Sequence, residues 1–259
     1  MISKGKESPN FKDRTGEKYT TNEGYEITII ACRGNRDCDI KFTGGHILTG
    51  INYAHMKKGN IKNPYHKSVF GVGYFGTGKY KSKSQDKHTI EYRFWKAMME
   101  RGYSKSYSDK QSSYKDVTVC DEWHNFQNFA AWFENNYNPD VMEGFALDKD
   151  ILIKGNKIYS PKTCCFVPQE VNNLFKVTKS CRGEYPVGVH LNNKLKIKAL
   201  LSKKGKQEDL GTFKTPEEAF KAYKTAKEEW IKIMADKWRG QITEPCYEAM
   251  CNYKVEITD

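Results

Sequence analysis

Residues 185–234 constrain the fold more than any other part of the sequence, because three short runs of strand type lead directly into a capped amphipathic helix. The middle run, 194–200, alternates lysine with aliphatic side chains, so its two faces differ sharply in polarity. A capping box at 215–218 starts the helix, and apolar residues then recur at helical spacing up to Met234. The pattern predicts a three-stranded sheet with one face covered by the helix and a lysine-rich face left open.

The rest of the chain also divides into short strand-type and helical segments. Runs rich in β-branched residues between 25 and 53 predict a small, strongly bent sheet. Aromatic residues at helical spacing predict helices over 89–103 and 121–137, with Asp121 as N-cap of the second. Residues 144–176 follow as strand, loop, strand and helix. The sequence therefore predicts an α+β protein: a small N-terminal β module, central helices with a ββα hairpin, and a C-terminal three-stranded sheet packed by one helix.

Turn residues and charge set the predicted boundaries between these parts. Polar, turn-rich residues predict a flexible N-terminal arm, and regularly spaced glycines followed by lysines predict a flexible basic tether ahead of the first helix. No role is predicted for the acidic end of the chain. The predicted parts are an arm (1–24), a basic β module (25–66), a linker (67–88), a core with the ββα hairpin (89–178), a sheet-and-helix domain (179–239) and an acidic tail (240–259).

Charge is distributed unevenly along the chain. The formal net charge of +11 consists of +8 over residues 1–88, −1 over 89–178, +7 over 179–239 and −3 over 240–259. Two basic parts therefore flank a neutral middle that keeps its carboxylates. Basic ends favour a polyanion such as nucleic acid as partner, although lysine-rich surfaces also serve solubility. The carboxylates of the middle suit a cation.

Composition excludes several classes of protein. Hydrophobic residues make up 38% and aromatic residues 13%, which excludes wholesale disorder. No run approaches the ~20 apolar residues of a membrane helix, and the first residues lack the apolar segment of a secretory signal, so no membrane partner is predicted. The eight cysteines form no CxxC pair and are predicted to be reduced, mostly buried thiols. The sequence does not specify an oligomeric state.

Residues 90–176 carry a long string of specific motifs. They are CDEW at 120–123, FQNF at 126–129, LDKD at 147–150, GN at 155–156 and YSPKTC at 159–164. The string resembles HNH endonucleases, especially the phage and bacterial homing endonucleases. The resemblance implies a ββα hairpin that binds a divalent metal ion and cleaves a phosphodiester bond of DNA, in the cytoplasm of a phage-infected bacterium.

The resemblance also implies roles for individual residues. Asp148 takes the place of the metal-binding aspartate at the end of the first strand, and Asn172 or Asn173 completes the metal site from the helix. Oxygen ligands of this kind suit Mg²⁺ or Mn²⁺, which would stabilise the leaving oxygen. Asn156 takes the place of the loop asparagine that orients the general base.

The family's general-base histidine is missing from this sequence. Lys149 takes its place, or Asp150 if the strand slips by one residue. A lysine between two aspartates stays protonated at neutral pH and suits phosphate binding better than proton abstraction. His124, on the preceding helix, is the alternative base. Two possibilities stay open: a metal-dependent nuclease or nickase, and a DNA-binding factor, regulatory or acting against host defence, on a catalytically dead scaffold.

The C-terminal segment carries a second resemblance. VGVH at 187–190 and LGTFKTPEEAFKAY at 210–223 resemble the Apetala/ethylene-response-factor DNA-binding domain, which is also found in phage homing endonucleases. The resemblance implies that exposed strand side chains contact double-stranded DNA. An RNA-binding protein would fit the charge but not this domain. Because lysine dominates, phosphate contacts are expected to outweigh guanine readout. The expected DNA-binding residues are Arg182, His190, Lys194, Lys196, Lys198, Lys203 and Lys204.

Overall fold

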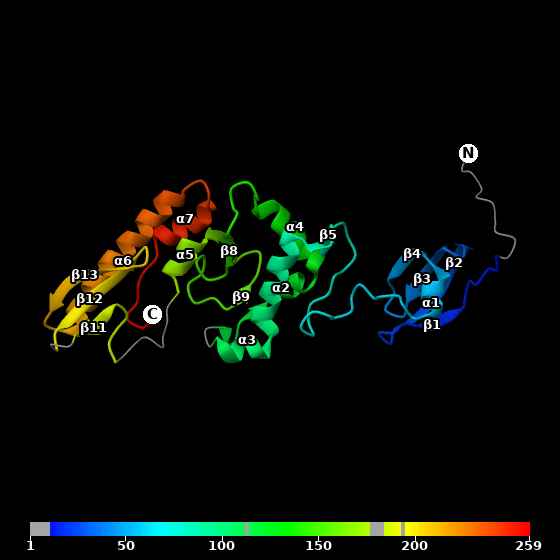
Figure 1. The fold of residues 1–259 in the computed structure, drawn as a ribbon, viewed down its shortest axis with the longest axis horizontal. Helices are drawn as coiled ribbons and strands as arrows, with labels where there is room; N and C mark the ends of the chain where they lie inside the picture. Colours follow the sequence, from blue (N-terminus) through cyan, green and yellow to red (C-terminus); the bar gives the residue numbers. More distant parts are fainter. Residues whose placement is uncertain (1–10, 112–113, 177–183, 193–194) are drawn as a thin grey trace. The chain divides into compact units, whose positions relative to one another are not determined.

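The structure, a computed structural model, describes residues 11–111, 114–176, 184–192 and 195–259 (Figure 1). It has a mixed α+β fold with several small sheets, which confirms the predicted fold class. The chain forms two compact units, residues 1–78 and 79–259. The boundary between the units falls inside the segment that the sequence predicts to be a linker.

The first unit is built on an antiparallel sheet with the strand order β1-β2-β3-β4. Ile27, Ile29, Ile40 and Phe42 alternate toward a core that is closed by Met56 of the short helix α1. β1 lies within the predicted flexible arm, and its pairing with β2 makes it part of the sheet. The elements are β1 (Lys18–Thr20), β2 (Glu26–Gly34), β3 (Asp37–Phe42), β4 (Ile47–Ile51) and α1 (Tyr53–Lys57).

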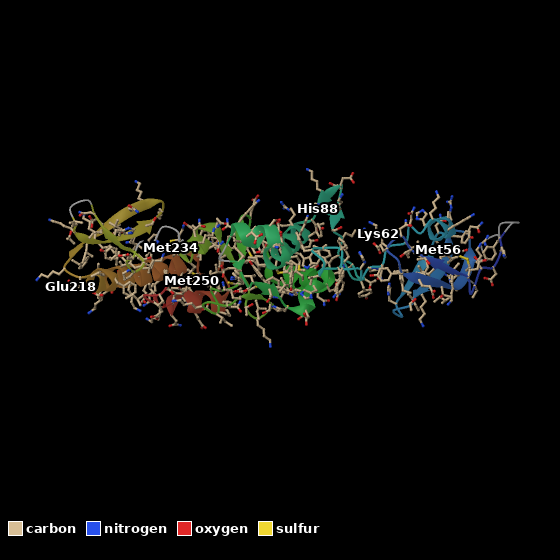
Figure 2. All side chains as sticks on the ribbon, turned by 90° about the horizontal axis from the view of Figure 1, so that it is seen from below. Met56, Lys62, His88, Glu218, Met234 and Met250 are labelled. Carbon is tan, nitrogen blue, oxygen red and sulfur yellow. A yellow bond between two sulfur atoms is a disulfide. The ribbon has the colours of Figure 1, made fainter. Side chains whose placement is uncertain are left out.

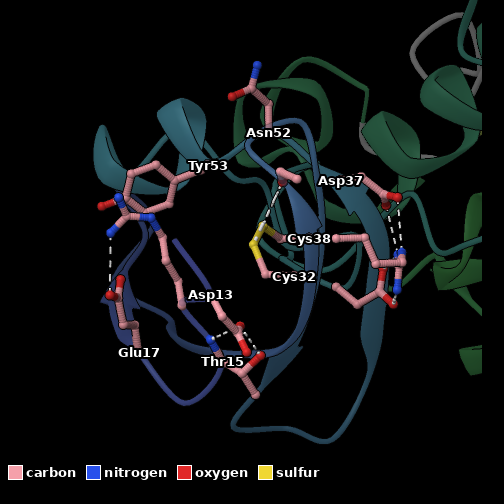
Figure 3. The surroundings of a disulfide bond; sticks show 12 residues. Asp13, Thr15, Glu17, Cys32, Asp37, Cys38, Asn52 and Tyr53 are labelled. Carbon is pink, nitrogen blue, oxygen red and sulfur yellow. Dashed lines mark hydrogen bonds and ion pairs between the residues drawn. A yellow bond between two sulfur atoms is a disulfide. The ribbon is translucent and has the colours of Figure 1, made fainter. Parts of the chain in front are cut away.

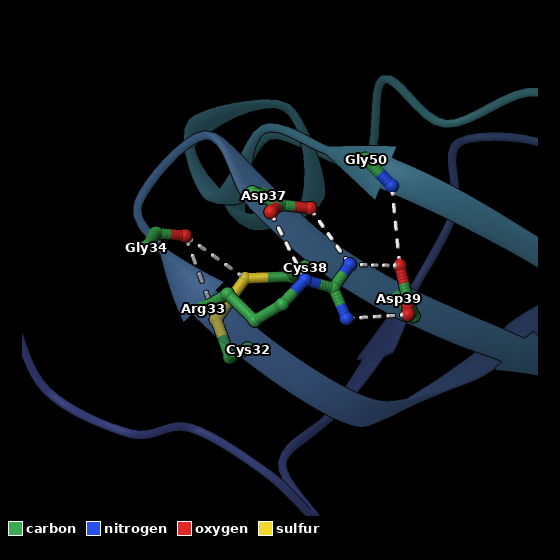
Figure 4. Close-up of polar contacts among 7 residues, drawn as sticks. All are labelled: Cys32, Arg33, Gly34, Asp37, Cys38, Asp39 and Gly50. Atoms are coloured by element: carbon green, nitrogen blue, oxygen red, sulfur yellow. Dashed lines mark hydrogen bonds and ion pairs between the residues drawn. A yellow bond between two sulfur atoms is a disulfide. The ribbon is translucent and has the colours of Figure 1, made fainter. Parts of the chain in front are cut away.

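A disulfide joins β2 to β3 where Cys32 and Cys38 lie opposite each other (Figure 3). The prediction of reduced cysteines is therefore wrong for this pair, because the register of the hairpin places the half-exposed Cys32 opposite the buried Cys38. On the same hairpin the guanidinium of Arg33 donates to the carboxylates of Asp37 and Asp39, at 2.7–3.0 Å (Figure 4). The disulfide and this ion-pair network both lie beside the turn that joins β2 to β3 and hold that end of the hairpin together.

The second unit opens with two helices that pack through aromatic side chains. Trp95 of α2 and Trp123, Phe126 and Phe129 around α4 are fully buried, as the aromatic spacing predicts. The elements are β5 (Lys83–Ser84), β6 (Lys87–His88), α2 (Ile90–Tyr103), α3 (Lys105–Lys110), β7 (Thr118–Val119), the 3₁₀ turn η2 (Asp121–His124) and α4 (Phe126–Asn136).

The predicted helix over 121–137 is divided in two. The chain makes the 3₁₀ turn η2, passes through Asn125 in an extended conformation, and only then enters α4. The side chain of Asn125 accepts the N–H of Gln127 at 3.0 Å and so satisfies one of the free donors at the helix start. The N-cap is therefore Asn125, and the prediction of Asp121 as the cap is wrong.

The segment that precedes α2 is held in place rather than being a free tether. The main chain of Tyr80 forms two hydrogen bonds with the side-chain amide of Gln127 on α4. The short hairpin β5–β6 follows, and the hydroxyl of Thr89, the N-cap of α2, donates to the carbonyl of Lys81. Figure 2 shows His88 at the end of this hairpin. Part of the segment 67–88, predicted as a flexible tether, thus contacts α4 and forms a short hairpin.

A two-stranded antiparallel sheet and a short helix follow α4. β8 pairs with β10, whereas the short strand β9 runs parallel to β7 and so ties this region to the end of α2. Phe166 and Val167 of β10 are buried against the aromatic side chains of α2 and α4. The elements are β8 (Phe145–Asp148), β9 (Ile158–Tyr159), β10 (Cys165–Pro168) and α5 (Gln169–Leu174).

The chain then forms the antiparallel sheet β11-β12-β13, on which the long helix α6 packs. Ala199 and Leu201 of β12 meet Ala219 and Tyr223 of α6 in the core, and the hydroxyl of Thr215 caps the helix as predicted. The middle strand lies further along the chain than the predicted run 194–200. The elements are β11 (Val189–Leu191), β12 (Ile197–Lys203), β13 (Lys206–Phe213), α6 (Pro216–Trp238) and α7 (Glu244–Cys251). Within the described residues, no helix has both the length and the apolar character that crossing a membrane requires.

The last twenty residues are integrated into the second unit. In α7, Cys246 is completely buried and its thiol lies 3.5 Å from that of Cys165 on β10. Val255 is 3% exposed and belongs to the core beneath the sheet β11-β12-β13. The main chain of Val255 bonds to the side chains of Lys224 and Glu228 on α6. The segment 240–259, for which the sequence predicts no role, thus packs against β10 and also fills the core beneath the sheet β11-β12-β13.

Candidate functional site

The first candidate site lies where strand β8 ends. β8 and β10 pair with Asp148 opposite Cys165, and α5 starts directly after Pro168. α5 packs against both strands, and its Val171 is completely buried. The fold thus places α5 against the strand that carries Asp148.

Asp148 is a buried carboxylate that fixes the turn after β8. Its side chain is mostly shielded, with 8% of the residue exposed. The main-chain N–H groups of Asp150 and Ile151 both donate to Oδ1, each at 2.8 Å. Burial first, and then the charge of Asp150, raise the pKa of Asp148 to about 6, and the two N–H donors act in the opposite direction. Both bonds are made to Oδ1, and a side-chain hydrogen bond with Asp150 adds to the raised pKa of Asp148.

Lys149 is buried as deeply and points back into its own loop. Its ammonium group donates to Oδ2 of Asp150 at 3.0 Å and to the main-chain carbonyl of Asn156 at 3.1 Å. The amide of Asn156 donates in return to the main-chain carbonyl of Lys149 at 2.6 Å. Lys149 therefore connects two parts of the loop. Its ammonium group is already bound to Asp150 and Asn156, which disfavours its use in holding a phosphate.

Asn156 closes the same loop at its other end. Its amide also donates to the carbonyl of Ile158 at 2.7 Å, and its Oδ1 accepts the N–H of that residue at 3.3 Å. The turn before it passes through Gly155 with φ of 76°, a conformation that favours glycine. Asn156 therefore orients the main chain of the residue in the base position, Lys149, by holding its carbonyl.

His124 faces α2 and β7 instead of the loop. Its Nε2 lies 2.7 Å from the hydroxyl of Tyr103 and 3.1 Å from the carbonyl of Val119. Its Nδ1 lies 3.6 Å from the carboxylate of Asp121. In the described part of the chain, its polar partners include no residue of the loop 149–156. The structure does not bring this candidate base together with Asp148.

The helix residues expected to complete a metal site fit that role only in part. Oδ1 of Asn173 already accepts from Nε2 of Gln169 at 3.0 Å and from the ammonium of Lys176 at 2.8 Å. Asn172 is half-buried on the same helix. Among the described residues there is no group of three or more His, Cys, Asp or Glu side chains placed to hold a metal ion. Asp148 suits Mg²⁺ or Mn²⁺ as one oxygen ligand, and Asn173 would first have to release Lys176.

The second group of candidate residues lies on the open face of the sheet β11-β12-β13. His190 and Lys198 lie opposite each other, on the face turned away from α6, because the neighbouring Ala199 is buried against the helix. Lys196 is exposed and shares this face by alternation. The ammonium of Lys198 pairs with the carboxylate of Asp209. Among the described residues named here, this face carries His190, Lys196 and Lys198, and Lys198 is paired with Asp209.

Two expected cations lie elsewhere. The ammonium of Lys203 lies 5.5 Å from the ring centroid of Trp230 on α6 and 2.8 Å from the carboxylate of Glu208, which places Lys203 on the helix-covered side. Lys204 is exposed in the turn between β12 and β13, with φ of 51°. Neither residue shares the open face with Lys198, because strand alternation and the turn direct them away from it. Two further expected residues lie outside the described part of the chain: Arg182 and Lys194.

Sequence reasoning missed a cation in the loop after β8. Lys154 donates to the carbonyl of Lys254 at 2.7 Å and to the carboxylate of Asp259 at 2.8 Å, and its ammonium lies 4.9 Å from the ring centroid of Tyr253. The C-terminal segment therefore binds directly to the loop of the candidate site. Residues about a hundred positions apart make this contact, so no local pattern in the sequence could have indicated it.

Comparisons of the chain with protein-family models, with curated proteins and with solved structures give no match. The functional proposal therefore rests on the residues of this chain, on their geometry and on the motif resemblances.

Proposed function

We propose that this chain binds double-stranded DNA through the open face of the sheet β11-β12-β13, as a protein of the HNH homing-endonuclease type. The observation that carries the proposal is the register of His190 with Lys198 on a face that α6 leaves open. A narrow β-ribbon fits the major groove, and lysines on its outer face neutralise phosphates. The motif resemblances support the same partner, a phage origin and action in the bacterial cytoplasm.

The geometry of the loop 149–156 favours binding without cutting. A general base must be deprotonated and must reach the attacking water. Lys149 is held by Asp150 and Asn156, and the polar partners of His124 lie elsewhere. These contacts favour a DNA-binding factor, regulatory or acting against host defence, that keeps an HNH-type scaffold.

Metal-dependent nicking at Asp148 is the second candidate function. Asp148 is a buried carboxylate at the end of β8, and the two main-chain bonds that fix the turn are both made to its Oδ1. The charge of the nearby Asp150 raises the pKa of Asp148, so simultaneous ionisation of both carboxyl groups is disfavoured. A divalent cation would relieve the repulsion between the two carboxylates. The order strand, loop, strand and helix around Asp148 supports this candidate.

DNA binding is tested by fluorescence anisotropy with a labelled duplex at several salt concentrations. If ~6–10 phosphates are contacted, affinity falls about 10³–10⁵-fold between 50 and 200 mM salt. Lys196→Ala/Lys198→Ala should weaken binding several-fold more than Lys221→Ala/Lys232→Ala, which removes the same charge from exposed positions of α6. Equal losses would place the contact surface elsewhere, and salt-independent affinity would contradict DNA binding.

The two candidate functions are separated by incubation of supercoiled plasmid with Mg²⁺ or Mn²⁺. A protein that only binds leaves the plasmid supercoiled with either ion. If nicking occurs, Asp148→Ala should abolish it while leaving anisotropy with the duplex nearly unchanged, since Asp148 would be a metal ligand and not a phosphate contact.

A further inference from the structure

Two free cysteines lie in contact in the interior of the second unit. Cys165 belongs to β10 and Cys246 to α7, and the thiol of Cys165 donates to the sulfur of Cys246 at 3.5 Å. Both are shielded from solvent, with 3% of Cys165 and 0% of Cys246 exposed. Neither takes part in the disulfide of the first unit. The fold thus holds two thiols side by side.

The two sulfur atoms are close enough to be joined without rebuilding the fold. Sulfur atoms in a disulfide are about 2.05 Å apart, so these two have to approach each other by about 1.5 Å. A change of this size is within reach of side-chain rotation combined with a small movement of α7, a helix of eight residues. The geometry therefore favours a bond between them.

Such a bond would connect two parts of the second unit that are distant in sequence. The two cysteines are 81 positions apart. Cys165 lies opposite Asp148 in the pairing of β10 with β8. α7 leads into the segment whose Val255 fills the core beneath the sheet β11-β12-β13. The bond would tie the strands of the first candidate site to the C-terminal segment that completes this core.

We propose that Cys165 and Cys246 form a site of oxidative modification, at which a hydroperoxide such as hydrogen peroxide creates a disulfide between β10 and α7. The proposal stands on the contact between the two sulfur atoms, on their burial and on the elements that carry them. It goes beyond the proposed function and does not depend on DNA binding.

The reaction has two steps and removes two electrons from the pair of sulfur atoms. In the first step one thiol loses its proton to water and its sulfur attacks the peroxide. An S–O bond forms, the O–O bond breaks, and the released hydroxide takes up a proton to become water. In the second step the other thiol loses its proton and its sulfur attacks the sulfenic acid. The S–S bond forms, the S–O bond breaks, and the leaving hydroxide becomes the second water.

Burial determines both the rate and the product of this reaction. Peroxide reaches shielded sulfur atoms only when the surrounding structure opens locally, so the reaction is slow. Once one sulfur carries an oxygen, the other sulfur is already in contact and displaces that oxygen before more peroxide arrives. The expected product is therefore the disulfide and not a sulfinic acid.

Peptide mapping after prolonged peroxide treatment tests the site directly. Remaining thiols are blocked with iodoacetamide, and the whole chain is digested with trypsin without reduction. Trypsin releases the peptide 163–176, which contains Cys164 and Cys165, and the peptide 240–254, which contains Cys246 and Cys251. We expect these peptides to be joined, with the loss of two hydrogen atoms, and fragmentation should place the bond at Cys165 and Cys246. Separate, alkylated peptides or a bond at other cysteines would overturn the proposal.

Alanine variants identify the two sulfur atoms by a second route. Cys165→Ala and Cys246→Ala should each abolish the joined peptides, whereas Cys164→Ala and Cys251→Ala should keep them. The controls are closely matched, because Cys164 is also buried beside Cys165 and Cys251 lies on the same helix as Cys246. Joined peptides in Cys165→Ala or Cys246→Ala would contradict the assignment. If either variant does not fold, the fragmentation of the wild-type peptides decides the question.

Thermal unfolding gives a readout that depends on the bond itself. The disulfide closes a long loop in the unfolded chain, so peroxide should raise the Tm of the second unit by about 5–15 °C. Dithiothreitol should reverse the change. Cys251→Ala should show the same rise, and Cys246→Ala should show none. Reduction of the disulfide in the first unit is common to all these proteins. An equal rise in Cys246→Ala would overturn the site.

Discussion

The side chains of Lys149 and Asn156 each donate to the main-chain carbonyl of the other, at 3.1 Å and 2.6 Å. This reciprocal pair closes the loop after β8 from both ends. The ammonium of Lys149 thus stabilises the loop through the carbonyl of Asn156 and the carboxylate of Asp150. The relationship leads to a first prediction about stability.

Asn156→Ala should lower the free energy of unfolding by about 2–3 kcal/mol. The change removes three hydrogen bonds and leaves the carbonyl of Lys149 without its amide donor. Urea unfolding measures the effect. Asn135→Ala is the control, because Asn135 is exposed and its amide makes one bond, to the carbonyl of Ala131 in its own helix; a loss as large there would show that the loop contacts are not special.

Asp148→Asn should make the protein more stable than wild type at pH 7, by about 2 kcal/mol. The pKa of Asp148 is raised to about 6 in the folded state, so the folded protein holds this proton more tightly than the unfolded chain does. That contribution to stability is complete below about pH 4 and is lost as the pH rises through 6. Asparagine is neutral throughout and still accepts from Asp150 and Ile151.

The measurement for Asp148→Asn is urea unfolding of both proteins at pH 4, 5, 6 and 7. The gain over wild type should be absent at pH 4 and should grow up to pH 7. The exposed Asp140→Asn serves as the matched change and should show no such trend. A constant difference between wild type and Asp148→Asn across the series would contradict the raised pKa.

Lys149→His is the change expected to produce metal-dependent nicking. An imidazole titrates near ~6.5 and can accept a proton at neutral pH, whereas the ammonium of Lys149 is bound to Asp150 and Asn156. Conversion of supercoiled plasmid to open circles with Mg²⁺ measures the activity. Adding Asp148→Ala to the variant should abolish it. The control Lys162→His places a histidine at an exposed position nearby in sequence, and nicking by that variant would show that the position of the histidine does not matter.

Val255→Ala should destabilise the second unit by about 2 kcal/mol. Val255 is 3% exposed in the core formed by Ala199, Leu201 and Tyr223, so its truncation leaves a cavity there. Amide hydrogen exchange should become faster in β11 and β12. Val141→Ala, at a position that is 49% exposed, should have almost no effect; equal exchange rates in wild type and Val255→Ala would mean that the sheet does not depend on this residue.

Strong local patterns predicted their elements well. The helix expected over 89–103 is α2, because Trp95 and Met99 recur at the helical period and are buried where that period places them. The cap at Thr215 followed from the capping box. The predicted helix over 121–137 begins too early. Trp123 continues the aromatic spacing of α4, but it lies in the 3₁₀ turn before that helix.

Features that depend on distant residues were beyond a local reading. β1 is polar, and it is a strand only because β2 offers it a free edge. The disulfide required the register of β2 with β3, which two bulges set. For the candidate site, sequence motifs indicated Asp148 and Asn156, but the engagement of Lys149 within its loop became visible only from the fold.

The contribution of Val255 to the core beneath β11-β12-β13 determines how this domain could be exchanged between proteins. A segment limited to residues 179–239 would carry the whole sheet and α6 but leave behind the valine that fills the core and the backbone bonds to Lys224 and Glu228. Recombination that transfers the domain intact must therefore carry the C-terminal segment with it. The segment that must be inherited together is therefore longer than the sheet and the helix α6 alone.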